Sequence, residues 1–142
     1  MLRVVIDTNV LVSNILSKAG TPAKVIDAWR AQKFSLITSE AAIQELQSTL
    51  EKLHRSKKYS IPDEDIAEFT EMLRKNGQPI SALPNVTGAI PADPDDEKFL
   101  AMAIEGNASI IVSGDKHLLD LKEYQGITIL TPRQFLDSLD AE

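Results

Sequence analysis

Four short apolar runs alternate with helical patterns along the chain, and this alternation restricts the folds that the chain can adopt. The runs cover residues 2–6, 34–38, 108–113 and 127–130. Each has the length of one buried strand, and the segments between them show the helical spacing of apolar residues. Short apolar strands that alternate with helices form a parallel sheet whose two faces are both covered. The sequence therefore predicts an α/β fold, and 142 residues are most economically a single domain, residues 1–142.

Capping residues indicate where the helices begin and end. Ser, Thr and Asp accept hydrogen bonds from the free N–H groups of a first turn, and proline is tolerated at the first helical position. Four helices are expected to begin on this pattern, at Thr21 before Pro22, Ser39, Asp93 before Pro94, and Thr131 before Pro132. Another helix is expected to end at Gly77. The segment 77–92 is rich in Pro and Gly, which predicts a loop or an irregular edge strand.

The composition excludes several kinds of site. There are no cysteines, so disulfides and thiolate metal sites are excluded, and a reducing cytoplasm fits. With two histidines, His54 and His117, a histidine-rich zinc site is not expected. No apolar run has the length of a membrane span, and Met1 leads directly into the first strand without room for a signal peptide. We therefore expect a cytoplasmic protein without a membrane span.

Charge is distributed unevenly along the chain. The net charge of −6 argues against nucleic acid as a partner only if the acids are spread evenly. A cluster of acids that holds divalent cations would make the working charge less negative. The segment 52–59, KLHRSKKY, contains four basic residues and no acid, which predicts a patch that attracts phosphate. The alternative is a solvated helix end followed by a loop.

Two aspartates follow directly after predicted strands. The first strand stops on Asp7, Thr8 and Asn9, and Asp115 comes after the run SIIVSG. In an open parallel sheet the ligand crevice lies beyond the carboxyl ends of the strands, so both carboxylates are expected there. The alternative for each is a turn or N-cap residue, which is the commoner role of such an aspartate.

Helical geometry separates two further acids from their neighbours. At about 100° per residue, Glu45 lies about 60° beyond one edge of the apolar arc of its helix, whereas two other acids of that helix fall on the solvent side. A boundary salt bridge explains the position of Glu45 equally well. In DPDDE, residues 93–97, Asp96 falls inside the inward stripe and Glu97 near its edge. Acids of a first turn often cap the helix, but a carboxylate on a buried face is costly unless it is paired or metal-bound, which favours Asp96.

The four candidate acids, Asp7, Glu45, Asp96 and Asp115, share one kind of donor atom. Carboxylate oxygens without imidazole or thiolate partners are preferred by hard divalent cations, above all Mg²⁺ or Mn²⁺. Two such ions about 4 Å apart can activate water and stabilise the leaving oxygen of a phosphodiester. Clustered acids also repel one another, so some of their pKa values are expected to be raised.

The sequence resembles the PIN-domain family of metal-dependent ribonucleases in three motifs. These are VVIDTNVLVS, a helix that carries QEL, and DPDDEKFLAMAIEGNASIIVSGDKHLL. The resemblance covers nearly the whole chain and is greatest to the toxin components of the family, which include the toxins of VapBC-type pairs. It implies a three-layer α/β/α sandwich with a central parallel sheet of four to five strands. It also implies Mg²⁺ or Mn²⁺ as the cofactor, RNA as the substrate, often a homodimer and, for the toxins, a small antitoxin protein as a partner.

The resemblance also implies which residues form the site. The acids carried over are Asp7, Glu45, Asp96 and Asp115, with Glu97 as the alternative to Asp96, and their polar neighbours are Asn9 and Ser113. The helical wheel favours Asp96 for the third acid. Asn9 is expected to orient Asp7 through a hydrogen bond. With RNA as the substrate, the expected RNA-binding residues are those of the basic segment, Lys52, Arg55, Lys57 and Lys58.

Two other classes of protein stay open. A phosphatase or phosphotransferase would use an aspartyl nucleophile at a strand end. Its haloacid-dehalogenase-like version needs a second aspartate two residues after the first, where this chain has Asn9. A PIN-like module that binds RNA or protein without catalysis would lack some of the acids, and none is missing here. We therefore expect a divalent-metal-dependent endoribonuclease.

Overall fold

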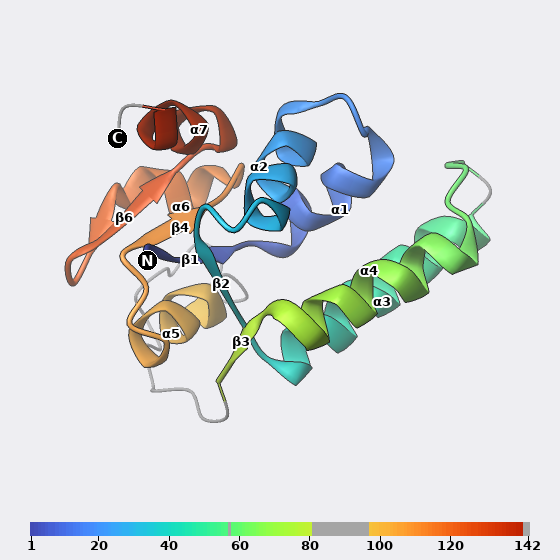
Figure 1. Ribbon diagram of the computed structural model, residues 1–142, viewed down its shortest axis with the longest axis horizontal. Coiled ribbons are helices and arrows are strands. Elements are labelled where there is room, and N and C mark those ends of the chain that lie inside the picture. The colour runs from blue at the N-terminus through green and yellow to red at the C-terminus, as the bar shows by residue number, and fades with distance from the viewer. Residues whose placement is uncertain (57, 81–96, 141–142) are drawn as a thin grey trace.

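The structure is a computed structural model that describes residues 1–56, 58–80 and 97–140. Its central feature is a mostly parallel sheet. Within these residues the sheet has six strands in the order β3-β2-β1-β4-β6-β5 (Figure 1). The strands are β1 (Arg3–Ile6), β2 (Ser35–Thr38), β3 (Gln78–Pro79), β4 (Ile110–Val112), β5 (Glu123–Tyr124) and β6 (Ile127–Leu130). All neighbours are parallel except β5, which forms an antiparallel hairpin with β6. The four predicted strands are confirmed, each within two residues of its expected ends. The expected total of four to five strands is too low, because the two-residue strands β3 and β5 extend the sheet at its two edges.

Helices cover both faces of this sheet. They are α1 (Thr8–Leu16), α2 (Thr21–Arg30), α3 (Glu40–Arg55), α4 (Asp63–Asn76), α5 (Glu97–Glu105), α6 (Lys116–Leu121) and α7 (Pro132–Asp140). None of the described helices is long and apolar enough to cross a membrane.

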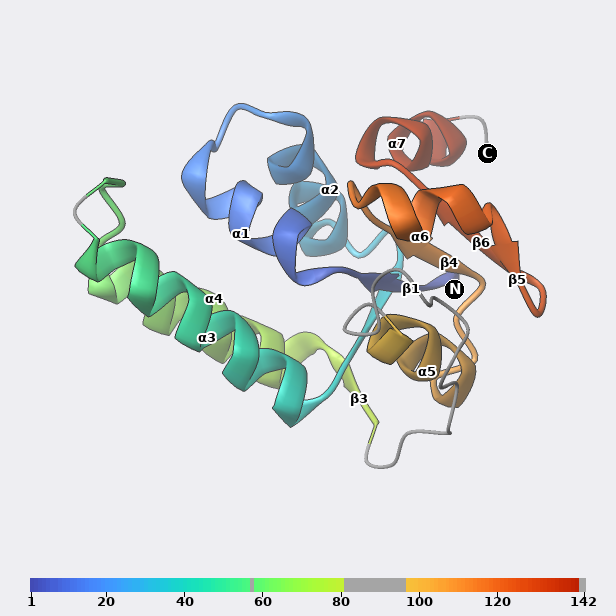
Figure 2. The ribbon, with the colours of Figure 1, turned by 180° about the vertical axis from the view of Figure 1, so that it is seen from behind.

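Each face of the sheet has its own hydrophobic core, because alternate residues of a strand point to opposite sides. On one face, Val4 and Ile6 of β1 belong to a core with residues of α1, α2, α3, α4 and α7. On the other face, Val5 of β1 and Ile111 of β4 belong to a core with residues of α5 and α6. The expected three-layer α/β/α sandwich is therefore confirmed, and Figure 2 shows the two helical layers from behind.

Helices α3 and α4, here called the arm, extend as an antiparallel pair beyond the edge of the sheet (Figures 1 and 2). Ser39 caps α3 as predicted, because its side chain accepts a hydrogen bond from the N–H of Ala42 at 3.1 Å. Helix α4 ends at Gly77, also as predicted, and the chain then enters β3. At the base of the arm, Nη2 of Arg74 lies 2.9 Å from Oε1 of Glu40. The arm therefore begins at the carboxyl end of β2, where this ion pair joins α3 to α4.

The proline-marked helix starts have different outcomes. At α7 the prediction is confirmed: Thr131 accepts from the N–H of Gln134 at 3.1 Å, and the Gln134 side chain accepts from the N–H of Thr131 at 2.9 Å. At α2 the prediction is wrong, because the N-cap is Gly20 and Thr21 is already helical. Proline fits either of the first two helical positions, so Pro22 does not fix the boundary to a single residue.

Three other segments add to what the sequence pattern indicates. Helix α1 follows β1 without a loop. The spacing of its apolar residues alone does not show whether this segment is a helix or a strand. Strand β3 confirms an irregular edge strand at the start of the segment 77–92. The rest of that segment and the expected cap at Asp93 lie outside the described residues.

Candidate active site

Asp7 lies at the carboxyl end of β1, where the strand passes directly into α1. Asp7 is buried, with 2% of its surface exposed to solvent. Oδ1 accepts a hydrogen bond from the N–H of Val10 at 2.9 Å, so the carboxylate caps α1. The N–H of Asp7 donates to the carbonyl of Val112 at 3.0 Å, which continues the pairing of β1 with β4. The polar residues that end the first apolar run thus form a strand-to-helix turn with a buried carboxylate.

Ser113 links Asp7 to Asp115. Ser113 follows β4, is completely buried, and donates from Oγ to Oδ2 of Asp7. The same Oγ accepts a hydrogen bond from the N–H of Asp115 at 2.9 Å. Asp115 caps α6, since its Oδ1 accepts from the N–H groups of His117 at 2.8 Å and Leu118 at 3.3 Å. One hydroxyl therefore connects two acids that follow neighbouring parallel strands.

Burial raises the pKa of Asp7 above its ordinary value of 3.8, and burial is the largest effect on this group. Hydrogen bonds from Ser113 and Val10 lower the pKa because they favour the carboxylate, and the negative charge of Asp115 raises it. The N–H of Gly114 lowers it as well. The net result is an acid whose ionised form is disfavoured. A cation beside it would favour that form and lower the pKa.

The donor atoms at this end of the sheet fit a hard divalent cation. Asp7 and Asp115 supply carboxylate oxygens, and Ser113 supplies a hydroxyl between them. In the part of the chain that the structure describes, no three Asp, Glu or His residues form a group that could hold an ion. Asp96 lies outside the described residues, so the convergence of four acids stays a prediction.

Glu45 of α3 is bound by a lysine that the sequence patterns did not single out. Nζ of Lys98 on α5 lies 2.6 Å from Oε1 and 2.5 Å from Oε2 of Glu45. The Glu45 and Lys98 side chains are 42% and 34% exposed, so the pair is partly open to solvent. The boundary salt bridge, the alternative for Glu45, is therefore present. The sequence signal for Lys98 was its position as a single basic residue directly after the acids of 93–97.

One small cavity lies between β1, α1, α3 and α5, and residues that directly follow Asp7, Glu45 and Lys98 in the chain line it. These residues are Thr8 after Asp7, Leu46 after Glu45 and Phe99 after Lys98. Asp7 and the two residues of the ion pair are not themselves among the residues that line this cavity. Among the described acids, it is Asp115 whose charge acts on the pKa of Asp7. The structure brings Asp7 and Asp115 together through Ser113, whereas Glu45 is bound by Lys98.

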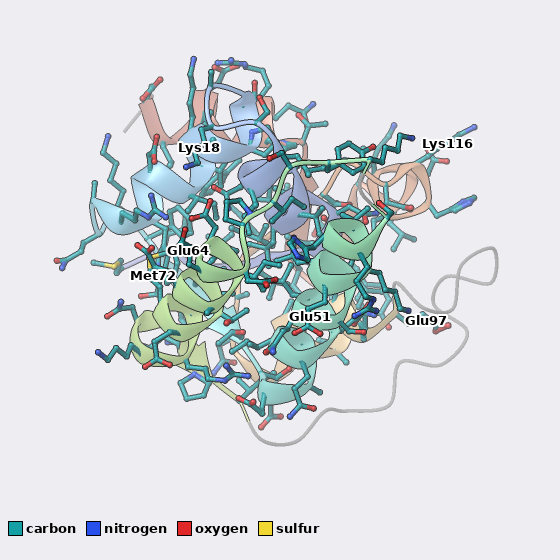
Figure 3. All side chains as sticks on the ribbon, turned by 90° about the vertical axis from the view of Figure 1, so that its right-hand side faces the viewer. Lys18, Glu51, Glu64, Met72, Glu97 and Lys116 are labelled. Atoms are coloured by element: carbon teal, nitrogen blue, oxygen red, sulfur yellow. The ribbon has the colours of Figure 1, made fainter. Side chains whose placement is uncertain are left out.

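The two remaining candidates, Glu97 and Asn9, differ in burial. Glu97, the alternative third acid, lies in the first turn of α5 and is 7% exposed. In Figure 3, Glu97 and Lys116 of α6 both lie on the side of α3 that faces away from α4. Asn9 is exposed, and the side-chain hydrogen bond to Asp7 expected from it comes instead from Ser113.

The basic segment lies at the far end of the arm. Lys52 and Arg55 are in the last turn of α3, Lys58 is in the loop that follows, and all three are exposed. Lys57 lies outside the described residues. Ten helical residues separate Glu45 from Arg55, which corresponds to about 15 Å. The basic residues therefore do not touch the acids, but share α3 with Glu45.

Comparison with known proteins shows the family. The family model of the PIN domain matches residues 3–117, which is most of the chain. The chain therefore belongs to the PIN-domain family. PIN domains are in general nucleases, and they typically use divalent metals.

Two individual proteins are similar over nearly their whole length. Uncharacterized protein MJ1680 of Methanocaldococcus jannaschii is 28% identical over 149 residues, which cover 98% of this chain and 92% of that protein. The crystal structure of PAE2754 from Pyrobaculum aerophilum aligns with a TM-score of 0.65 at 15% identity, over 99% of this chain and 91% of that one. The likeness to PAE2754 concerns the fold.

Proposed function

We propose that the protein is a divalent-metal-dependent endoribonuclease that hydrolyses RNA phosphodiester bonds. The observation that carries this proposal is the buried Asp7 carboxylate, linked through Ser113 to a second acid at the carboxyl edge of a parallel sheet. The raised pKa of Asp7 means that the ionised site is unfavourable without a positive charge. Perturbed carboxylates of this kind gather at functional sites. Membership of the PIN-domain family supports nuclease chemistry.

The chain's own residues have distinct proposed roles at this site. The residues proposed to hold Mg²⁺ or Mn²⁺ are Asp7, Glu45, Asp96 or Glu97, and Asp115. When bound, the ion lowers the pKa of water and neutralises charge on the phosphodiester. The N–H of Val10 and the hydroxyl of Ser113 engage one oxygen of Asp7 each, which fixes the plane of the carboxylate. Ser113 is therefore the proposed orienting residue, and Asn9 is the alternative.

The basic end of the arm is proposed to bind RNA. The exposed Lys52, Arg55 and Lys58, together with Lys57, would attract the phosphate backbone by charge, without reading the base sequence. Lys52 and Arg55 lie about 10 Å and about 15 Å from Glu45 along α3, so they would hold RNA away from the cleaved bond. They would therefore contribute to binding more than to the chemical step.

The physiological role is proposed from the family resemblance. We infer that the nuclease is the toxin component of a toxin–antitoxin pair, with a small antitoxin protein as its partner, a homodimeric assembly and a cytoplasmic location. A small DNA-binding protein encoded directly upstream would support the toxin role. A neighbouring gene for RNA processing would contradict it without affecting the nuclease proposal.

The nuclease proposal is tested by cleavage of a fluorescently labelled single-stranded RNA with and without Mn²⁺. Wild type is expected to cleave with Mn²⁺ and to stop on chelation with EDTA. Asp115→Asn is expected to be inactive. The matched control is Asp120→Asn, which changes an exposed acid on the same helix, α6. RNA binding without cleavage by wild type would instead support a PIN-like binding module.

A further inference from the structure

The ion pair between Lys98 and Glu45 conflicts with a simple role for Glu45 as a metal ligand. One ammonium contacts both oxygens of the carboxylate, at 2.6 Å and 2.5 Å. Mg²⁺ binds a carboxylate oxygen at about 2.0–2.1 Å. Two cations at such distances from one carboxylate would lie close enough to repel each other strongly. Binding of a divalent cation to Glu45 is therefore disfavoured while Lys98 keeps this geometry.

The position of the pair gives it little value for the stability of the fold. Both side chains are partly exposed, and ion pairs of this kind contribute about 0–1 kcal/mol. Helices α3 and α5 are already fixed by buried apolar residues next to the pair, Leu46 and Phe99. Nζ of Lys98 also lies 5.3 Å from the centre of the Phe99 ring. The buried ring thus helps to keep the ammonium over the Glu45 carboxylate.

We propose that Lys98 holds the Glu45 carboxylate until a divalent cation binds, and that the cation then displaces Lys98 from it. The inference rests on the proposed metal-dependent function. Lys98 is a positioning residue in this scheme, since it acts on the ion through Glu45. Its ammonium competes with the ion for the carboxylate and so sets how much cation is needed to fill the site.

Calorimetric titration of MnCl₂ into the full chain tests the competition without reference to catalysis. Lys98→Met keeps the length of the stem and removes the charge, so Mn²⁺ is expected to bind roughly threefold to tenfold more tightly. The matched control is Arg74→Met, which breaks the Arg74–Glu40 pair between α3 and α4 outside the site. This control is expected to bind Mn²⁺ as wild type does. Lys98→Gln repeats the test in case the methionine variant folds poorly.

A double-mutant cycle assigns the effect to Glu45. Glu45→Gln is expected to weaken Mn²⁺ binding, and adding Lys98→Met to it is expected to change nothing further. Unchanged or weaker binding by Lys98→Met, or a Glu45→Gln variant that binds like wild type, would overturn the displacement while leaving the Asp7–Asp115 site intact. A wild type that binds no Mn²⁺ would overturn the proposed function as well, so the two failures are distinguishable.

Discussion

Two of the candidate acids, Asp7 and Glu45, are held in opposite ways. Asp7 is buried, accepts hydrogen bonds from uncharged donors, and has a second acid beside it. Glu45 is partly exposed and is neutralised by a lysine. Burial disfavours the charge on Asp7, whereas solvent and Lys98 accommodate the charge on Glu45.

This difference predicts different roles for the buried acid and the partly exposed acid. The buried acid is fixed by backbone and hydroxyl donors, so it can present a carboxylate in a single orientation, at a cost in stability when ionised. The partly exposed acid contributes little to stability and can exchange partners at low cost. Variants of the first should therefore change activity and stability strongly, and variants of the second should change them weakly.

The largest effect is expected from Asp7→Asn. The amide retains an oxygen for the N–H of Val10 and can donate to Ser113, so the fold should survive while the charge is lost. Cleavage of labelled RNA with Mn²⁺ should fall at least about a hundredfold, since even residues that only orient a metal ligand contribute 10–100-fold. Circular dichroism should show an unchanged fold. A fully active Asp7→Asn would rule out Asp7 as a metal-holding acid.

Ser113→Ala should have the next largest effect. It removes the hydroxyl that orients Asp7 and lowers its pKa, so the pKa of Asp7 should rise further. Mn²⁺ affinity, measured by calorimetry, should fall about 10–100-fold. Ser138→Ala serves as the control, because Ser138 donates to a carbonyl within α7, away from the site. Equal Mn²⁺ affinity in wild type and Ser113→Ala would return the orienting role to Asn9.

The same two regions show what could be predicted from the sequence. The strand ends, the parallel sheet and the position of Asp7 follow from local patterns, because an apolar run that stops on polar residues marks the carboxyl edge. The partner of Glu45 does not follow, because Glu45 and Lys98 are 53 residues apart and only the tertiary fold brings the two side chains together. Ser113, and not the expected Asn9, donates a hydrogen bond to Asp7, and this likewise depends on the register of β1 with β4.

Loss of the basic segment should have a moderate effect that is confined to binding. The quadruple replacement of Lys52, Arg55, Lys57 and Lys58 by Ser should weaken RNA binding about tenfold at physiological salt and flatten its dependence on salt. Single-turnover cleavage of RNA already bound should change much less, because the segment begins about 10 Å from Glu45 along α3. Fluorescence anisotropy at several salt concentrations measures the slope. An unchanged slope would favour the alternative of a solvated surface.

The smallest expected effect is on stability as a function of pH. Because the folded pKa of Asp7 is raised, the folded state holds the proton more strongly than the unfolded state, so this contribution is complete below about pH 3.8 and is lost as pH rises through the folded pKa. Relative to Asp7→Asn, wild type should therefore lose unfolding free energy as pH rises. Urea unfolding between pH 4 and 8 in EDTA measures the difference. Glu45→Gln should differ little from wild type, since its ion pair is partly exposed. A stability gap between wild type and Asp7→Asn that stays constant with pH would mean that burial does not disfavour the Asp7 carboxylate, and the contrast between the two acids would then disappear.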